Sequence, residues 1–158
     1  MNKRILFFSL ACFFLLGCGK DDEDKDMEKP VIDMSGNTAS PRNCVVLYRG
    51  ESFSFRAIFF DNQELGNYNI EIHNNFDHHS HSTDQVECDL EPNKSPVNAF
   101  VYNQDFSIPS GKTMFNAENE IFIPADVDTG DYHFMVRVTD KAGWQQLRAI
   151  SLKIGDKE

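Results

Sequence analysis

Short runs in which apolar and polar residues alternate make up most of the chain from residue 30 onward. The clearest are residues 53–60 and 68–73, where apolar side chains recur at every second position. A period of two is typical of a β-strand with one buried face. Similar runs, separated by Gly, Pro, Asn and Asp, occupy residues 31–34, 97–102, 120–124, 132–139 and 146–154. Because no stretch repeats its apolar residues with a helical period, we predict an all-β domain of about seven strands.

A turn followed by a strand near residue 130 indicates which all-β fold the chain adopts. Asp128, Gly130 and Tyr132 precede a run whose apolar residues continue at every second position. This order resembles the tyrosine corner of immunoglobulin-like domains, in which the phenol hydroxyl bonds to the backbone a few residues upstream. Residues 30–158 are therefore predicted to form one immunoglobulin-like β-sandwich.

The N-terminus has the composition of an export signal. Lys3 and Arg4 precede an apolar run at residues 5–16. A helix that spans a bilayer needs roughly 20 apolar residues, so this run is too short to remain in the membrane. We interpret it as the apolar region of a cleaved signal peptide.

The end of this run predicts how the mature chain is held at the membrane. Residues 15–18 read Leu-Leu-Gly-Cys, which resembles the bacterial lipobox, where the cysteine becomes an acylated N-terminus. We predict a lipoprotein signal peptide at residues 1–17, an acylated Cys18 and an acidic tether at residues 18–29. The expected location is the outer membrane, on its periplasmic or surface-exposed side. The alternative is an ordinary export signal in which Cys18 has no role.

The charge of the chain excludes some partners. The net charge is −10 at pH 7, and loss of the leader with Lys3 and Arg4 would make it −12. Such a surface repels nucleic acid and favours cations as ligands. The acidic segment 126–131 has alternating carboxylates that suit calcium, but it lacks the spacing of an EF-hand loop. We interpret that segment as a turn.

Two cysteines remain for the exported domain once Cys12 has left with the signal and Cys18 is acylated. These are Cys44 and Cys88, and an oxidising compartment favours a disulfide between them. A loop of this length would stabilise the fold by roughly 3 to 4 kcal/mol. The alternative, in which both thiols bind a metal, is less favoured because neither lies in a Cys-x-x-Cys motif.

The histidines are the strongest functional signal in the sequence. Four of the five lie in the run His-Asn-Asn-Phe-Asp-His-His-Ser-His at residues 73–81. Short histidine-rich tracts are typical of metal binding, because a neutral imidazole donates a lone pair without carrying charge. His79 and His81 stand two residues apart, so in extended backbone both rings point to the same side.

The fifth histidine, His133, lies in another predicted strand. In an immunoglobulin-like sandwich the strand ending at His73 is antiparallel to the strand starting near His133, which makes the two residues cross-strand neighbours on the outer face. We therefore predict a transition-metal site; zinc is the expected ion, and copper and nickel are the alternatives. If there is no metal, the histidines only form hydrogen bonds at the surface. The candidate ligands are His73, His79, His81 and His133, then His78, and Asp77 as a ligand or as the partner that orients an imidazole.

Four motifs together resemble one family. The lipobox, the segments at residues 64–68 and 130–133, and the histidine run at 73–81 are similar to those of an uncharacterised family of small bacterial immunoglobulin-like lipoproteins, a domain of unknown function. The resemblance covers nearly all of the mature domain. It implies a cell-envelope location and carries no activity.

The sequence thus predicts a non-enzymatic lipoprotein that captures or transfers zinc or copper, with an outer-membrane transporter or another envelope protein as partner. The alternative is an adhesion or protein-binding module in which the histidines are incidental. An enzyme is not expected, because the sequence has no nucleophile elbow, no His-Glu-x-x-His motif and no phosphate-binding glycine loop.

Overall fold

The computed structural model describes residues 25–81 and 88–157. The predicted signal peptide at residues 1–17, Cys18 and the first part of the tether lie outside the described residues. Within the described residues there is no helix with the length and apolar character to cross a membrane.

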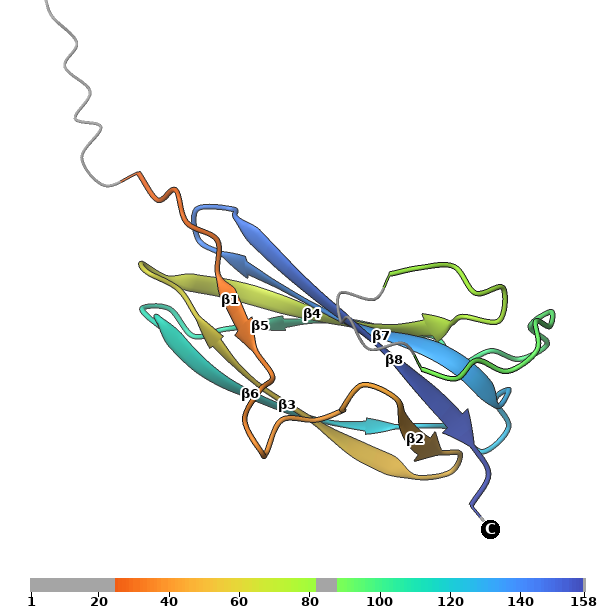
Figure 1. Cartoon of the computed structure of the whole chain (residues 1–158). Helices are drawn as coiled ribbons and strands as arrows, with labels where there is room; N and C mark the ends of the chain where they lie inside the picture. The colour runs from red at the N-terminus through yellow and green to blue at the C-terminus, as the bar shows by residue number, and fades with distance from the viewer. Residues whose placement is uncertain (1–24, 82–87, 158) are drawn as a thin grey trace, which may run out of the picture.

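Two sheets form the domain, and the described residues contain strands but no helix (Figure 1). One sheet has three strands in the order β1-β3-β6, and the other has five in the order β2-β8-β7-β4-β5. The all-β prediction is confirmed. The strands are β1 (Val31–Asp33), β2 (Val45–Tyr48), β3 (Ser52–Phe60), β4 (Leu65–Asn74), β5 (Tyr102–Ser107), β6 (Met114–Phe122), β7 (Gly130–Asp140) and β8 (Gln145–Gly155).

The pairing of the strands is that of an immunoglobulin-like sandwich. In the larger sheet β7 lies between β4 and β8 and is antiparallel to both, whereas β2 pairs in parallel with β8. The tyrosine corner is also present, because the Tyr132 hydroxyl donates to the Asp128 carbonyl at 2.6 Å. The predicted fold is therefore confirmed by topology and by this local motif.

The strand boundaries correct the sequence prediction in three places. The predicted strand at 97–102 is wrong: Val97 and Val101 are 93% and 68% exposed, and the strand begins only at Tyr102. The predicted strand at 120–124 is the end of the longer β6, and β2 was not predicted. All three errors concern edge or mostly polar strands, where backbone pairing forms the sheet without a clear apolar alternation. The count is eight strands rather than about seven.

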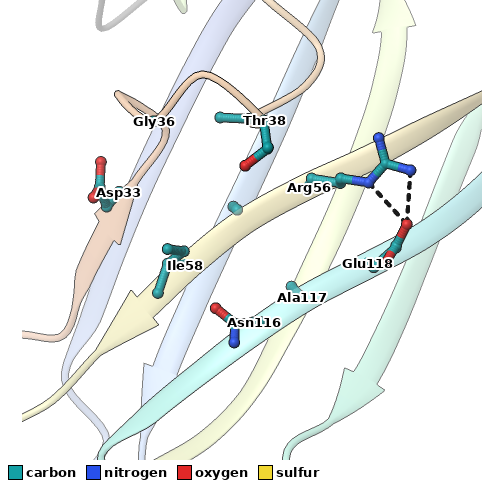
Figure 2. A pocket seen from close by; sticks show the side chains of 10 residues that line it. Asp33, Gly36, Thr38, Arg56, Ile58, Asn116, Ala117 and Glu118 are labelled. Atoms are coloured by element: carbon teal, nitrogen blue, oxygen red, sulfur yellow. Dashed lines mark hydrogen bonds and ion pairs between the residues drawn. The ribbon is translucent and has the colours of Figure 1, made fainter.

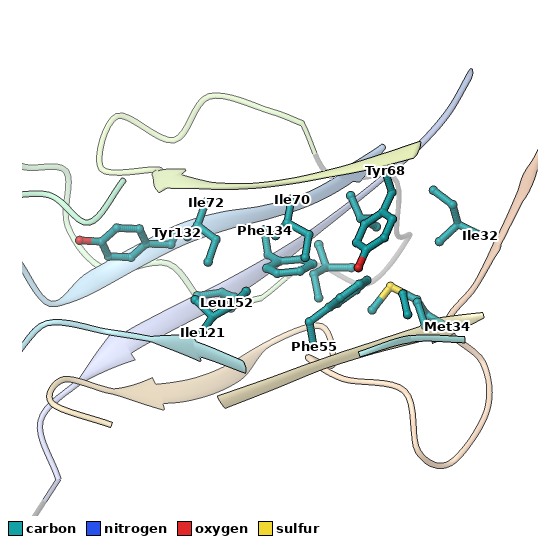
Figure 3. Close-up of a cluster of buried hydrophobic side chains, with 14 of the residues drawn as sticks. Ile32, Met34, Phe55, Tyr68, Ile70, Ile72, Ile121, Tyr132, Phe134 and Leu152 are labelled. Atoms are coloured by element: carbon teal, nitrogen blue, oxygen red, sulfur yellow. The ribbon is translucent and has the colours of Figure 1, made fainter. Parts of the chain in front are cut away.

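The core lies between the two sheets and is rich in aromatic rings (Figure 3). Phe55 packs against Phe134 across the sandwich with ring centroids 5.5 Å apart, and Phe59 packs against Tyr68 at 5.1 Å. The predicted inward residues of β3 and β4 are buried except Phe53, which is partly buried against the core, and this confirms the alternation in both strands. Burial of large rings supplies much of the apolar area that stabilises a domain of this size.

The β4–β7 pair runs the length of the domain and defines its two ends. Leu65 pairs with Asp140 at one end, and His73 pairs with His133 at the other. The two ends carry different side-chain chemistry.

Candidate metal site

The predicted neighbourhood of His73 and His133 is confirmed, since the two residues are directly opposite each other in the β4–β7 register. Ile72 and Phe134 face the core, so the adjacent histidines face away from it. His133 is nevertheless only 2% exposed. The reason is that the chain following β4 folds back over the outer face of the sheet.

This return of the chain is fixed by buried anchors just after β4. Phe76 is buried and packs edge-on against Tyr132, with ring centroids 5.3 Å apart. The Asn75 amide donates to the Asp131 carbonyl at 2.8 Å, and the His78 amide donates to the Asn75 carbonyl at 3.2 Å. His78 adopts a φ of 60°, in the left-handed region that non-glycine residues rarely occupy. The turn brings His79 and His81 over the sheet.

A second segment holds the turn from outside. The Lys94 amide donates to the Phe76 carbonyl at 3.1 Å, and the Glu91 amide donates to Asp131 Oδ2 at 2.7 Å. Cys44 and Cys88 form a disulfide, which ties the start of this segment to the chain just before β2. The loop that carries the histidines is therefore held on both sides.

Three imidazoles converge on one point. One ring nitrogen from each of His73, His79 and His81 lies within 4.8 Å of the others. The Nε2 atoms of His73 and His79 are 3.3 Å apart. Two ligands of a tetrahedral ion with bonds of about 2.05 Å also lie about 3.3 Å apart. The spacing of this pair therefore matches that of two nitrogens on one ion.

Two carboxylates set the tautomers of this pair. Glu71 Oε1 lies 3.0 Å from His73 Nδ1, and Asp77 Oδ1 lies 2.5 Å from His79 Nδ1. Because an ionised carboxylate only accepts hydrogen bonds, each Nδ1 carries the hydrogen and each Nε2 presents a bare lone pair in the neutral ring. Two lone pairs at this distance repel unless a proton or a cation lies between them. Carboxylates behind the ligating imidazoles are a common feature of metal sites.

His133 adjoins the three converging rings without joining them. The centroids of all four rings are 4.9 to 5.7 Å apart. Its Nε2 donates to the His79 carbonyl at 2.9 Å, so Nδ1 carries the lone pair. Nδ1 is buried and has no hydrogen-bond partner in the part of the chain that the structure describes. His133 thus holds the loop at His79 through Nε2, and the lone pair of its Nδ1 remains available close to the cluster.

Burial favours the neutral form of two of these rings, those of His73 and His133. Burial lowers the pKa of His73 and of His133, and the Glu71 carboxylate opposes this effect at His73 without cancelling it. The hydrogen bond from His79 lowers the pKa of the Asp77 carboxyl. The lowered pKa values of His73 and His133 favour the neutral imidazole, which is the form that binds a metal.

The structure separates the predicted site residues into groups. His73, His79 and His81 meet, His133 lies against them, and Asp77 bonds to His79. His78 is turned away, because its Nε2 donates to the Glu91 carbonyl at 2.8 Å.

Glu71 was missed by the sequence prediction. It lies two residues before His73 in the same strand, on the same face. That spacing was the signal available in the sequence.

A hollow elsewhere in the domain offers different chemistry. It lies on the three-stranded sheet beside the loop after β1, and the ion pair between Arg56 and Glu118 at 2.8 Å forms one side of it (Figure 2). Its lining contains no histidine or cysteine. It is on the other sheet from the histidine cluster and provides no alternative set of nitrogen ligands.

Comparison with known protein families identifies one family. Residues 16–155 match the profile of the family described as Domain of unknown function (DUF4625). A comparison with curated proteins found no match.

Among solved structures, the GspB Siglec domain is 20% identical, with a TM-score of 0.44 over 84% of this chain and 60% of that one. The SrpA adhesin from Streptococcus sanguinis is 16% identical, with a TM-score of 0.45 over 84% of this chain and 57% of that one. The chain thus spans well under two thirds of both.

Proposed function

Because this chain belongs to the DUF4625 family, whose function is unknown, we propose a function from the site itself: a non-enzymatic cell-envelope domain that binds a transition metal ion. The ligands are His73, His79 and His81, and zinc is the expected ion. The observation that carries the proposal is the pair of bare Nε2 atoms 3.3 Å apart, each on a ring whose Nδ1 bonds a carboxylate. A bound cation removes the repulsion between these lone pairs.

The donor set limits the choice of ion. Imidazole nitrogen suits zinc, copper and nickel, whereas calcium and magnesium prefer oxygen. His133 is the fourth donor in this proposal, through Nδ1, whose lone pair is otherwise buried without a partner. The His133 ring is near enough for this role, with its centroid 5.1 to 5.7 Å from the other three, but only the nitrogens of His73, His79 and His81 already converge, so the His133 ring must turn towards the ion.

Exposure of the site favours capture or transfer over a purely structural role. His81 is exposed and His79 is partly exposed, so solvent reaches one side of the cluster. A structural zinc site is usually closed to solvent, whereas a site that exchanges its ion must be accessible from solvent. In this proposal Cys18 is acylated and anchors the domain in the outer membrane, where an outer-membrane transporter or another envelope protein receives or delivers the ion.

The first test is metal binding to the soluble chain from Gly19 to Glu158, prepared without a histidine tag. This chain contains the whole folded unit, because every buried core residue lies between Ile32 and Ile154. Zinc at 1,000 times its dissociation constant should stabilise the fold by about 4 kcal/mol. Calorimetry and the thermal midpoint measure this, with copper and nickel in parallel. No heat and no shift with any of the three ions would refute the proposal.

Variants locate the ion. The double variant His79→Ala/His81→Ala should lose the zinc response. His78→Ala is the matched control: it removes an imidazole from the same loop, but one whose Nε2 is engaged by the Glu91 carbonyl. If the control loses zinc as fully as the double variant, the ligand assignment is wrong.

The role of His133 is separable from that of the loop histidines. In His133→Gln the amide can still donate to the His79 carbonyl, but the Nδ1 donor is gone. If His133 is a ligand, this variant should bind zinc much more weakly than the wild type and should unfold at a similar temperature. Unchanged zinc affinity would reduce His133 to a positioning residue.

The second candidate function is an adhesion or protein-binding module. It is favoured by the loop before β5, where Val97 and Val101 are exposed, and by the outer edge of β5, which pairs with no other strand within residues 25–81 and 88–157. An open strand edge can add a strand from another protein. A partner that binds the wild type and the His79→Ala/His81→Ala variant equally, and that is lost with Val97→Ser/Val101→Ser, would favour this function over metal transfer.

A further inference from the structure

Three aspartates from distant parts of the chain meet at the end of the sandwich away from the histidines. Asp26 precedes β1, Asp61 follows β3, and Asp140 ends β7. One carboxylate oxygen from each lies within 4.8 Å of the others. Figure 1 shows the N-terminal segment passing this end of the sandwich, close to the turn between β7 and β8.

Backbone and side-chain donors orient each carboxylate through one oxygen. The Oδ1 atom of each aspartate accepts two hydrogen bonds, of 2.6 to 3.0 Å. Five of the six donors are backbone amides of the same turn or segment, so the orientation is set locally. The donors are Glu28 N and Asn62 Nδ2 for Asp26, Gln63 N and Glu64 N for Asp61, and Gly143 N and Trp144 N for Asp140.

Two of the second oxygens have no hydrogen-bond partner among the described residues. Oδ2 of Asp61 and Oδ2 of Asp140 are both buried and accept no hydrogen bond. Asp26 is 6% exposed and Asp140 is 4% exposed. Within residues 25–81 and 88–157, no ion pair joins a lysine or arginine to any of the three. Three carboxylates therefore lie together, two of them on buried side chains and one on a partly buried side chain, and none is paired with a positive charge from the described residues.

Such an arrangement is unfavourable without a cation. Carboxylates at this distance repel, and burial removes the water that would screen them. Hydrogen bonds to the Oδ1 atoms offset part of the desolvation but supply no positive charge. A cation bound between the unused oxygens would satisfy both the charge and the missing contacts.

We propose that Asp26, Asp61 and Asp140 form a binding site for a calcium ion. The available ligands are all oxygens, which suits a hard cation rather than zinc or copper. Calcium takes several protein carboxylates together, whereas magnesium keeps most of its water and uses one or two. Carbonyl oxygens and water complete the coordination shell.

The site would link the tether to the folded domain. Asp26 belongs to the segment between the predicted acylation site and β1, whereas the other two aspartates belong to turns of the sandwich. The indole Nε1 of Trp144 donates to the Asp26 carbonyl at 2.9 Å, and this contact joins the same two parts. Calcium would therefore fix the direction in which the domain extends from its tether.

Trp144 also makes the site measurable, because it is the only tryptophan in the chain. The experiment uses the chain from Gly19 to Glu158, freed of metal with EDTA and titrated with calcium chloride. We expect a saturable change in tryptophan fluorescence and a higher thermal midpoint, with a weaker response to magnesium. If calcium produces neither change, or if magnesium matches it, the proposal fails.

Variants assign the response to the three carboxylates. Asp61→Asn and Asp140→Asn keep an oxygen for the backbone amides, so both should fold, and each should lose the calcium response. In EDTA no cation offsets the repulsion between the three carboxylates, and each variant removes one of these charges. Their thermal midpoints should therefore equal or exceed that of the wild type. Because Asp61 is less buried than Asp140, its variant remains informative if Asp140→Asn fails to fold.

Asp128→Asn is the matched control. Its Oδ2 also accepts two backbone amides, Val97 N at 2.7 Å and Asn98 N at 2.8 Å, but it lies outside the cluster. We expect it to keep the calcium response. A response that persists in Asp61→Asn and Asp140→Asn would overturn the site. His79→Ala/His81→Ala should respond to calcium as the wild type does. The calcium proposal is therefore tested independently of the zinc proposal.

Discussion

The two ends of the β4–β7 pair hold side-chain clusters of opposite chemistry. At one end His73 and His133 pair across the strands, and the loop after β4 adds two more imidazoles. At the other end Asp140 pairs with Leu65, and two further carboxylates join it. One cluster offers neutral nitrogens with lone pairs and the other offers charged oxygens. In our two proposals, the same pair of strands therefore presents a site for a borderline metal at one end and a site for a hard metal at the other.

The two clusters also differ in what keeps them in place. Asp61 and Asp140 are each oriented by backbone amides two to four residues away, so the direction of these two carboxylates is set by local turns. The histidine loop instead depends on contacts made across the fold, among them Phe76 on Tyr132 and the disulfide. Perturbations of the tertiary contacts that hold the histidine loop should therefore affect zinc binding more than calcium binding.

The disulfide gives the largest expected effect. Replacing Cys44 and Cys88 with serine opens a loop with a sequence separation of 44 residues, which should cost about 3 to 4 kcal/mol of unfolding free energy. Urea unfolding measures the loss. In the fraction that stays folded, zinc affinity should fall because the segment that begins at Cys88 holds the histidine loop. Equal losses of zinc and calcium affinity would contradict the proposed difference between the ends.

The carboxylates behind the imidazoles give a smaller effect confined to one end. Glu71→Gln and Asp77→Asn should each weaken zinc binding by about 10- to 100-fold, since they orient His73 and His79 and raise their basicity. Titration calorimetry measures the affinity. Glu120→Gln is the control, because Glu120 accepts a hydrogen bond from Ser54 on the other sheet. Glu71→Gln with wild-type zinc affinity would show that the carboxylate does not act on the metal.

The sequence predicted the histidine end and missed the aspartate end, for a physical reason. Four histidines lie within nine residues, and a period of two placed His133 opposite His73, so local pattern and sheet geometry were sufficient. Asp26, Asp61 and Asp140 meet only through the tertiary fold and share no local motif. The acidic segment that did stand out, residues 126–131, is the turn it was interpreted to be.

Burial explains a further difference between pattern and structure. Alternation placed His133 on the outer face correctly, but it could not show that the loop after β4 would cover that face and leave His133 buried. The left-handed turn at His78 produces this cover, and no residue pattern marked it. The same turn is the reason that His78, beside two candidate ligands, points elsewhere.

A change of pH should have the smallest effect on stability. It distinguishes the histidine cluster from the aspartate cluster without any mutation. Burial lowers the pKa of His73 and His133 below the ordinary 6.5, so as pH falls the unfolded chain takes up these protons before the folded one does. Stability of the metal-free domain is then complete above about pH 6.5 and is lost as pH falls from there through the lowered values. Thermal midpoints in EDTA from pH 8 to pH 5 measure this loss, and His133→Gln should reduce it.

Zinc stabilisation should decline over the same range because protons compete for the imidazoles. Calcium stabilisation should change less, because no imidazole belongs to the aspartate cluster; a parallel decline for both ions would mean that the two ends do not act separately.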